Sequence, residues 1–173
     1  MNRARRTQIL FLLRFFLLLA AFYAVVALEI VDRLVVAPFT HGVAIASAAL
    51  LNILGQQVQV VGTAIRNNAF AVQIANGCNG LEAVVFLCAA ILAFPAPWRR
   101  RAAGMALTIV TIQAINLVRV VSLFLLGRYR PDVFEVFHLA VWQTIILGIA
   151  ALMFYGWTGR GARPAEIDHQ YSA

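Results

Sequence analysis

The sequence contains no lysine and few charged residues of any kind, although apolar runs fill most of its 173 residues. Charged residues make up 12% of the chain and hydrophobic residues 62%, a composition typical of an integral membrane protein and not of a soluble domain. All 14 basic residues are arginine, and the net charge of +7 is better explained by loop orientation in a bilayer than by nucleic-acid binding. The expected surrounding is therefore the lipid bilayer, and no nucleic acid is expected as a partner.

Cysteine is scarce as well. The two cysteines, Cys78 and Cys88, are ten residues apart and form no CxxC pair. Cys88 falls within an apolar run, where a disulfide to Cys78 would be awkward. We therefore expect neither a disulfide framework nor a metal site, and no cofactor.

Four apolar runs are interpreted as membrane spans, at about residues 9–28, 81–95, 102–126 and 136–157. About 20 helical residues cross the hydrocarbon core of a bilayer. Arginines gather before the first run, between the second and third, and after the fourth, which places these ends in the cytoplasm. The sequence predicts an all-α membrane protein with about four transmembrane helices. It forms one domain over residues 1–173, with a polar cytoplasmic tail at about 158–173.

The segment between Val35 and Leu54 is apolar but carries Pro38, His41 and Asn52. We expect an interfacial or partly inserted helix here, with a full span as the competing interpretation. Counting crossings favours the interfacial helix, because four spans already bring the three arginine clusters to one side.

Residues 56–75 change to a period of two, with Asn67 and Asn68 between two alternating runs. This pattern predicts a β-hairpin with a tight turn at the two asparagines. Because open sheet edges cannot face lipid, the hairpin should be extracytoplasmic, in water or at the membrane surface.

A polar, glycine-bearing turn carries Cys78 immediately before an apolar run. Asn79 is expected to cap the helix that follows, with Glu82 three residues later as in a capping box. The free N–H groups and the positive end of the helix dipole favour a thiolate at Cys78, although Glu82 partly opposes this. The alternative is a small residue that only fills a tight turn.

Gln113, Asn116 and Arg119 recur every three positions in an apolar helix, so they face inward together. An arginine within a membrane helix is costly and usually functional. The structural alternatives are snorkelling of Arg119 to phosphates or an ion pair with Asp132 or Glu135.

His138 opens the last apolar run. A lone histidine there could be merely interfacial, but Cys78, Arg119 and His138 each lie at the outer end of a different span and could meet at one depth. Thiol catalysis on a carbonyl needs a nucleophile, an acid/base partner and an oxyanion donor, and these three residues supply them. Glu135, about one turn earlier, could orient the imidazole.

In these motifs the chain resembles the exosortase and archaeosortase family of membrane cysteine transpeptidases. The resemblance rests on the turn at 77–82, on the segment at 116–119 and on His138, and it covers roughly residues 74–155. Within the family the chain looks most like the compact exosortase H type. Carried over, Cys78 is the nucleophile, Arg119 stabilises the oxyanion and His138 is the acid/base partner.

The resemblance implies an enzyme of the plasma (inner) membrane that acts on exported proteins. Their carboxy-terminal sorting signal comprises a short motif, of the Ile-Pro-Thr-Leu kind for the compact type, then a transmembrane helix and a basic tail. Cleavage through a thioester would pass the protein to an acceptor, which the sequence leaves open among water, a lipid amine and a glycan precursor. The alternative is a non-catalytic membrane scaffold or export-assembly subunit, in which Arg119 pairs with an acidic residue and Cys78 only packs.

Overall fold

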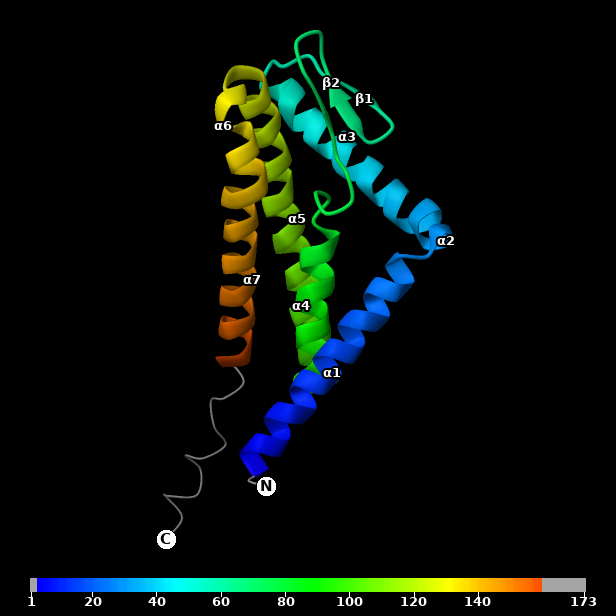
Figure 1. Ribbon diagram of the computed structural model, residues 1–173, viewed down its shortest axis with the longest axis vertical. Helices are drawn as coiled ribbons and strands as arrows, with labels where there is room; N and C mark the ends of the chain where they lie inside the picture. Colours follow the sequence, from blue (N-terminus) through cyan, green and yellow to red (C-terminus); the bar gives the residue numbers. More distant parts are fainter. Residues whose placement is uncertain (1–2, 160–173) are drawn as a thin grey trace.

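A computed structural model describes residues 3–159 of the chain, as helices joined by one small sheet (Figure 1). Two short π-helical stretches, η1 and η2, interrupt the longer helices. The elements in chain order are α1 (Arg3–Val26), α2 (Glu29–Val31), η1 (Asp32–Val36), α3 (Ala37–Ile53), β1 (Gln59–Val61), β2 (Ala64–Arg66), β3 (Ala71–Gln73), α4 (Leu81–Ala93), α5 (Trp98–Tyr129), α6 (Pro131–Val136), η2 (Phe137–Val141) and α7 (Trp142–Gly159).

Helices α1, α4, α5 and α7 each have one end in the lower part of the molecule in Figure 1, and α5 extends from there to the upper part. The start of α1, the α4–α5 connection and the end of α7 all lie at this lower end. Helix α5 has 32 residues and is about 48 Å long, whereas α4 has 13 and is about 20 Å long. Helix α4 therefore begins halfway up α5, and the turn that precedes it lies at that level.

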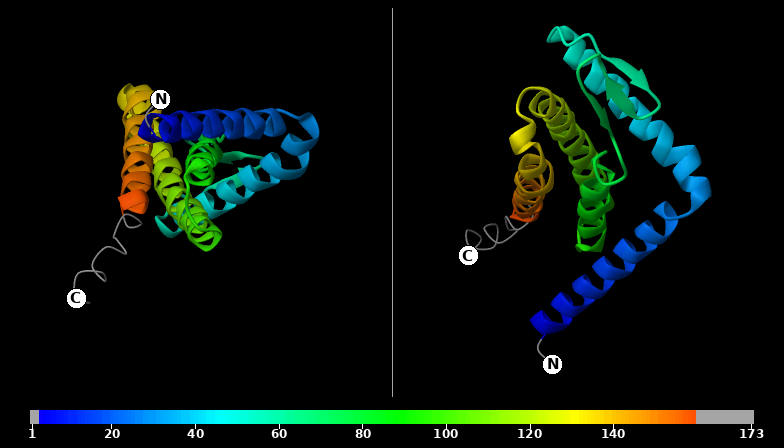
Figure 2. Two further views of the ribbon diagram at one scale, coloured as in Figure 1. Left: turned by 90° about the horizontal axis from the view of Figure 1, so that it is seen from below. Right: turned by 45° about the horizontal axis from the view of Figure 1, so that its top comes forward.

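Helix α3 climbs further away from the lower end instead of returning to it. Figures 1 and 2 show α1 and α3 meeting at a bend at α2, with α3 crossing over toward the top of α5. The buried face of α3 packs on α5 and on the sheet through residues that include Val43, Ala44 and Leu51. Because α3 makes no return crossing, the start of α1 and the end of α7 lie at the same end.

The helices long and apolar enough to span a membrane differ in part from those that the sequence predicts. In the described part of the chain they are Arg5–Val26, Glu29–Ile53, Trp98–Tyr129 and Pro131–Gly159. The number four is confirmed, but the second membrane-length helix contains the segment predicted as interfacial, and α4 falls below the length required. The cause is continuity, because α2, η1 and α3 join into one helical stretch of 25 residues. The predicted tail lies outside the described residues from 160 onward.

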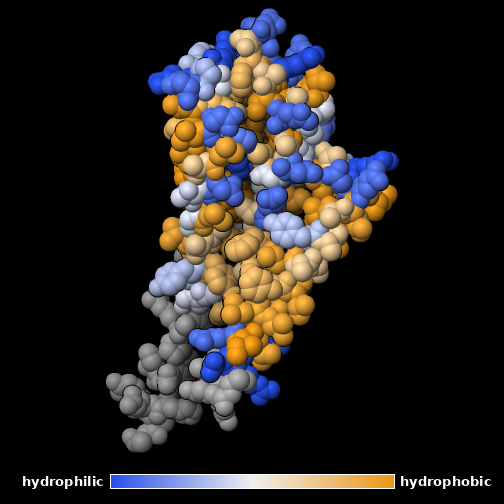
Figure 3. All heavy atoms as spheres, viewed as in Figure 1, coloured by the Kyte–Doolittle hydropathy of each residue, from blue (hydrophilic) through white to orange (hydrophobic). Residues whose placement is uncertain are grey.

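Hydropathy follows this arrangement. In Figure 3 the lower half, over α1, is covered by hydrophobic residues, whereas the upper half around α3 and the sheet mixes hydrophilic and hydrophobic ones. If the lower end lies at one edge of a hydrocarbon layer, about 20 residues of α5 counted from Trp98 reach the other edge close to Arg119. The upper part of α5, the sheet and α6 then extend beyond the apolar layer.

The predicted hairpin is instead a three-stranded antiparallel sheet of order β1-β2-β3. The turn at Asn67 does connect two strands, since the Asn67 side chain accepts the backbone N–H groups of Ala69 and Phe70. However, the strand before this turn is β2, and β1 pairs with β2 through a second tight turn at Gly62, whose φ is +62°. The sequence prediction missed that turn because a single glycine within the alternating run is a weak signal.

Phe70 fastens the sheet to helix α5. Its ring packs edge-on against Phe124 of α5, with centroids 5.5 Å apart, and against Phe134 of α6, with centroids 6.1 Å apart. Gly127 makes room for it, because a Cβ there would lie 2.1 Å from the Phe70 ring. The Phe70 ring, which we call the Phe70 wedge, therefore sets the distance between β3 and the helices α5 and α6.

We expect Gly127→Ala to destabilise the protein, because the added methyl group forces the Phe70 ring out of its site. Overpacking of this kind costs about 1–3 kcal/mol, against a gain in helix propensity of about 1 kcal/mol. The measurement is the Tm in detergent. Gly148→Ala in α7 is the matched control, since a Cβ there meets nothing within 4 Å, and it should leave Tm unchanged or raise it. Equal Tm values for the two variants would contradict the claim that the Phe70 ring needs the space at Gly127.

Candidate active site

Cys78 is held in a tight turn between β3 and α4. Its backbone N–H donates to the carbonyl of Ala75 at 3.0 Å. Gly77 and Gly80 adopt φ of +88° and +78°, which L-residues with side chains rarely adopt. The two glycines thus let the chain reverse on either side of the thiol.

Gly80 also brings this turn against helix α5. A Cβ at Gly80 would lie 3.0 Å from Gln113 Nε2 and 3.1 Å from the Asn116 side chain. Arg119 lies one turn further along the same face of α5. Close packing of Gly80 on Asn116 therefore places the neighbouring Cys78 beside Arg119.

The structure brings together the three side chains that the sequence singles out. The Cys78 Sγ lies 3.2 Å from His138 Nε2 and 3.7 Å from Arg119 Nη2. They come from the turn before α4, from α5 and from η2, and are separated by 41 and 60 residues from Cys78. Such an arrangement can exchange a proton between thiol and imidazole while a fixed cation faces the sulfur. Their catalytic roles stay a prediction.

His138 lies in the π-helical stretch η2. Single π-turns within helices occur often at functional sites, because the extra residue per turn redirects side chains. The imidazole packs against the ring of Phe134, with centroids 5.6 Å apart. Phe134 in turn contacts Phe70, so the rings of Phe70, Phe134 and His138 form one row. The residue pattern contains no signal that predicts this π-turn.

Arg119 has no acidic partner among the described residues. Its side chain is 3% exposed, and Asp132, one of the predicted alternatives, is bound by Arg130 at 2.9 Å. Glu135, the other, is exposed and makes no ion pair in the described part of the chain. A buried guanidinium without a counter-ion is available to an anion that forms beside it.

The supporting residues fall into place only in part. Gly80 occupies the N-cap position in a left-handed conformation, so the predicted capping box with Glu82 is wrong, but the Asn79 side chain does bind a free N–H group at the start of the helix, as predicted. Asn79 is buried, accepts the N–H of Leu81 at 3.0 Å and donates to Thr40 of α3 at 2.9 Å. It ties the cysteine turn to α3, a contact that the sequence does not indicate.

Asn116 and Glu135 differ in their surroundings. Asn116 is fully buried, and its amide, like that of Gln113, has no hydrogen-bond partner in the part of the chain that the structure describes. Glu135 lines the same cavity as His138, but no hydrogen bond joins the two in this structure. The predicted orienting contact is therefore not made here.

The three side chains open into a cavity of about 400 Å³ between β3 and the helices α5, α6 and η2. Phe70, Val120 and Leu123 are among its apolar walls, and Glu135 is its one acidic residue. A cavity of this size, apolar with a few polar groups at one place, is typical of a small binding site. Across residues 3–159, no three His, Cys, Asp or Glu side chains cluster as a metal site would require.

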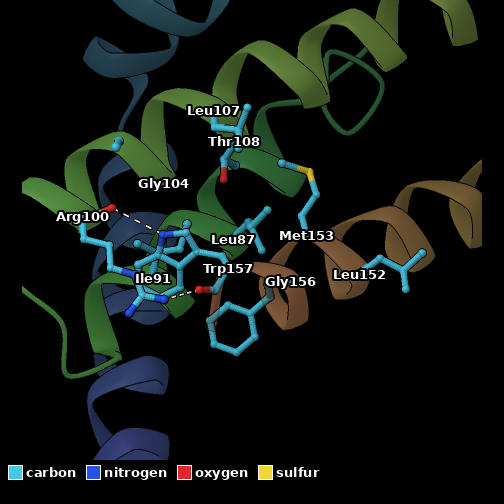
Figure 4. A pocket seen from close by; sticks show the side chains of 12 residues that line it. Leu87, Ile91, Arg100, Gly104, Leu107, Thr108, Leu152, Met153, Gly156 and Trp157 are labelled. Carbon is cyan, nitrogen blue, oxygen red and sulfur yellow. Dashed lines mark hydrogen bonds between the residues drawn. The ribbon is translucent and has the colours of Figure 1, made fainter. Parts of the chain in front are cut away.

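Another cavity, of about 500 Å³, lies between α4, α5 and α7 (Figure 4). In it the guanidinium of Arg100 donates to the Trp157 carbonyl and stacks on the Trp157 ring at 4.6 Å. The side chains that line it include no cysteine, histidine or carboxylate. It therefore offers no thiol, and no imidazole or carboxylate that could act as a base, so the cavity at Cys78 is the candidate active site.

Cys88 provides an internal control for the thiol at Cys78. It lies in α4, is 8% exposed and does not line the cavity of about 400 Å³. We expect Cys88→Ala to retain full activity and abundance, because the substitution removes only a small buried group. The measurement is the processing of an exported protein that carries the sorting signal, the client, by the variant and by the native protein at matched membrane levels. Loss of processing by a well-inserted Cys88→Ala protein would contradict a mechanism with one thiol.

Fold and site together define a multi-pass membrane protein with a cysteine, a histidine and an arginine converging in one cavity. The model of the transmembrane exosortase family matches residues 5–156. This chain belongs to that family. No curated protein and no solved structure matches it. Family membership supports a general role as a membrane transpeptidase.

Proposed function

We propose that the protein is a cysteine transpeptidase that cleaves carboxy-terminal sorting signals of exported proteins and transfers the exported part to an acceptor. The observation that carries this proposal is the contact of the Cys78 Sγ with both His138 and Arg119 in the lining of one cavity. The reaction would take place at the extracytoplasmic face of the plasma (inner) membrane. A client helix inserted beside α5 and α7 would bring the motif that precedes it to the depth of Cys78.

In the first half-reaction, the Cys78 thiolate attacks the scissile carbonyl carbon. The carbonyl oxygen becomes an oxyanion, and the Arg119 guanidinium, which has no acidic partner among residues 3–159, donates hydrogen bonds to it. His138, having taken the thiol proton, gives it to the leaving amine as the C–N bond breaks. The products are a thioester on Cys78 and a released helix with its basic tail.

In the second half-reaction, an acceptor attacks the thioester. His138 accepts the acceptor's proton and returns it to the Cys78 sulfur as the C–S bond breaks. Water would yield a free carboxylate, whereas a lipid amine would yield an amide and a glycan hydroxyl an ester. The same residues serve all three outcomes.

The scaffold alternative requires Arg119 to be neutralised by an acidic partner. In the described part of the chain Asp132 is paired with Arg130, and the polar contact of the Arg119 guanidinium is with the Cys78 sulfur. This arrangement favours catalysis over a purely structural role.

The test is co-expression with a reporter made of an exported soluble domain, an Ile-Pro-Thr-Leu segment, an apolar helix of about 20 residues and an arginine-rich tail. We expect the reporter to lose the mass of its helix and tail, and the mass of the new terminus identifies the acceptor. A trapped adduct of reporter and protein should be released by hydroxylamine, as a thioester is. The control is the same reporter with the four motif residues scrambled. A reporter of full mass beside the native protein, or equal cleavage of both reporters, would contradict the proposal.

A further inference from the structure

The outer edge of strand β3 forms one wall of the cavity that contains Cys78. Residues 70–75 all line this cavity, facing α5, α6 and η2 across it. In the sheet order β1-β2-β3, strand β3 has a partner on one side only. Its other edge therefore borders the same space as the thiol.

The hydrogen bonds of the sheet reveal which backbone groups of β3 are free. Phe70 accepts from Asn67 at 2.9 Å, and Ile74 donates to Thr63 at 3.0 Å, so both direct their backbone groups toward β2. In an antiparallel strand successive residues direct these groups to alternate sides. Ala71 and Gln73, which are exposed, thus present their N–H and C=O groups away from β2 and toward the cavity.

Unpaired strand edges are normally covered or blocked by charge, because they pair readily with another extended chain. No proline or charged residue lies on Ala71–Gln73. The strand leads directly into the turn of Cys78, whose N–H uses the carbonyl of Ala75. An extended chain added beside Ala71 and Gln73 would therefore run alongside the segment that ends at the nucleophile.

We infer that the client's cleavage segment binds as an extended strand along the free edge of β3, with the backbone N–H and C=O groups of Ala71 and Gln73 as its partners. This inference rests on the proposed function, because it assigns the substrate position at the same site. Backbone pairing holds the peptide in register, and alternate side chains enter the space lined by Val120, Leu123 and Phe134. The occupant is an uncharged, extended peptide with small or apolar side chains, since the cavity walls are mostly apolar and the charges of Arg119 and Glu135 are of opposite sign.

The direct test measures amide hydrogen exchange, resolved to single residues, on the full-length Cys78→Ala protein with and without the Ile-Pro-Thr-Leu reporter. This variant cannot form the thioester, so the readout is binding and not turnover. We expect exchange at Ala71 and Gln73 to slow at least about tenfold on binding. Exchange at Ile74 should change little, because its N–H is already paired with Thr63. This alternation distinguishes strand addition from general shielding of the cavity.

A second test removes one outward N–H from the strand. Gln73→Pro leaves the pairing with β2 intact, because proline is tolerated where the N–H does not serve the sheet. We expect it to lower reporter cleavage at least about tenfold. The matched control is Val60→Pro in β1, whose alternation likewise directs its N–H outward but at the opposite edge, away from the cavity. It should cleave at the native rate.

The outcomes separate the two proposals. Unchanged exchange at Ala71 and Gln73, together with Cys78-dependent cleavage by the native protein, overturns strand pairing and leaves the thiol chemistry standing. Slowed exchange with no cleavage by the native protein supports the strand and overturns the chemistry. Native cleavage by Gln73→Pro also overturns the inference.

Discussion

Replacing Cys78 by alanine or by serine is expected to abolish processing of the reporter, with a loss of at least about a thousandfold. Alanine removes the nucleophile. Serine replaces the thiol by a hydroxyl of similar size. His138 and Arg119 lie 3.2 Å and 3.7 Å from the native sulfur, but a hydroxyl is a far weaker nucleophile than a thiolate. Both variants should therefore fail for the same chemical reason.

The measurement is the mass of the reporter after co-expression with each variant at matched membrane levels. Cys88→Ala serves as the matched control, because it changes the other thiol, which lies outside the cavity. Thermal unfolding in detergent should differ little between the native protein and Cys78→Ser, since Cys78 is only partly buried. A mass shift that persists in Cys78→Ala would remove Cys78 as the nucleophile.

Much of the fold is predictable because each signal is local. Long apolar runs and arginine clusters predict an all-α membrane protein, and the structure confirms it. The details that fail depend on tertiary contacts. The continuity of Glu29–Ile53 depends on a π-helical junction at Asp32–Val36, and the pairing of β1 depends on a turn at Gly62, neither of which leaves a periodic pattern.

The site illustrates the same division. The convergence of Cys78, Arg119 and His138 is expected from counting the ends of the predicted spans, although Arg119 lies within α5 and α4 is shorter than a span. The contacts that hold these three side chains together cannot be predicted from the ends of the spans. They are the close approach of Gly80 to Asn116, the π-turn at His138 and the wedge of Phe70 at Gly127, and each needs two elements in contact before it has a meaning.

The free edge of β3 was also beyond sequence reasoning. The alternation of Phe70, Val72 and Ile74 indicates a strand, but strand order decides which edge stays open. A simple hairpin would have offered either of two edges. The three-stranded order leaves β3 open on the side of Cys78, and the inferred binding of the client strand depends on this open edge.

Arg119→Lys is expected to lower kcat about a hundredfold with little change in KM. Lysine keeps the positive charge but not the planar fork of donors, so it cannot reproduce the geometry of the guanidinium beside the Cys78 sulfur. The oxyanion exists only after attack, and an interaction made only in the transition state appears in kcat and not in KM. A rise of about a hundredfold in KM with kcat unchanged would instead indicate that Arg119 binds the client in the ground state.

Arg128→Lys is the matched control for this prediction, because Arg128 lies on the same helix and binds Gln56 at 2.6 Å outside the cavity of Cys78. It should process the reporter at close to the native rate. Removing the charge as well, in Arg119→Met, should cost at least as much as Arg119→Lys. Native kinetics in Arg119→Lys would exclude an oxyanion role that depends on the guanidinium fork. The contact with Cys78 would then serve only to hold the thiolate, a task that an ammonium group performs equally well.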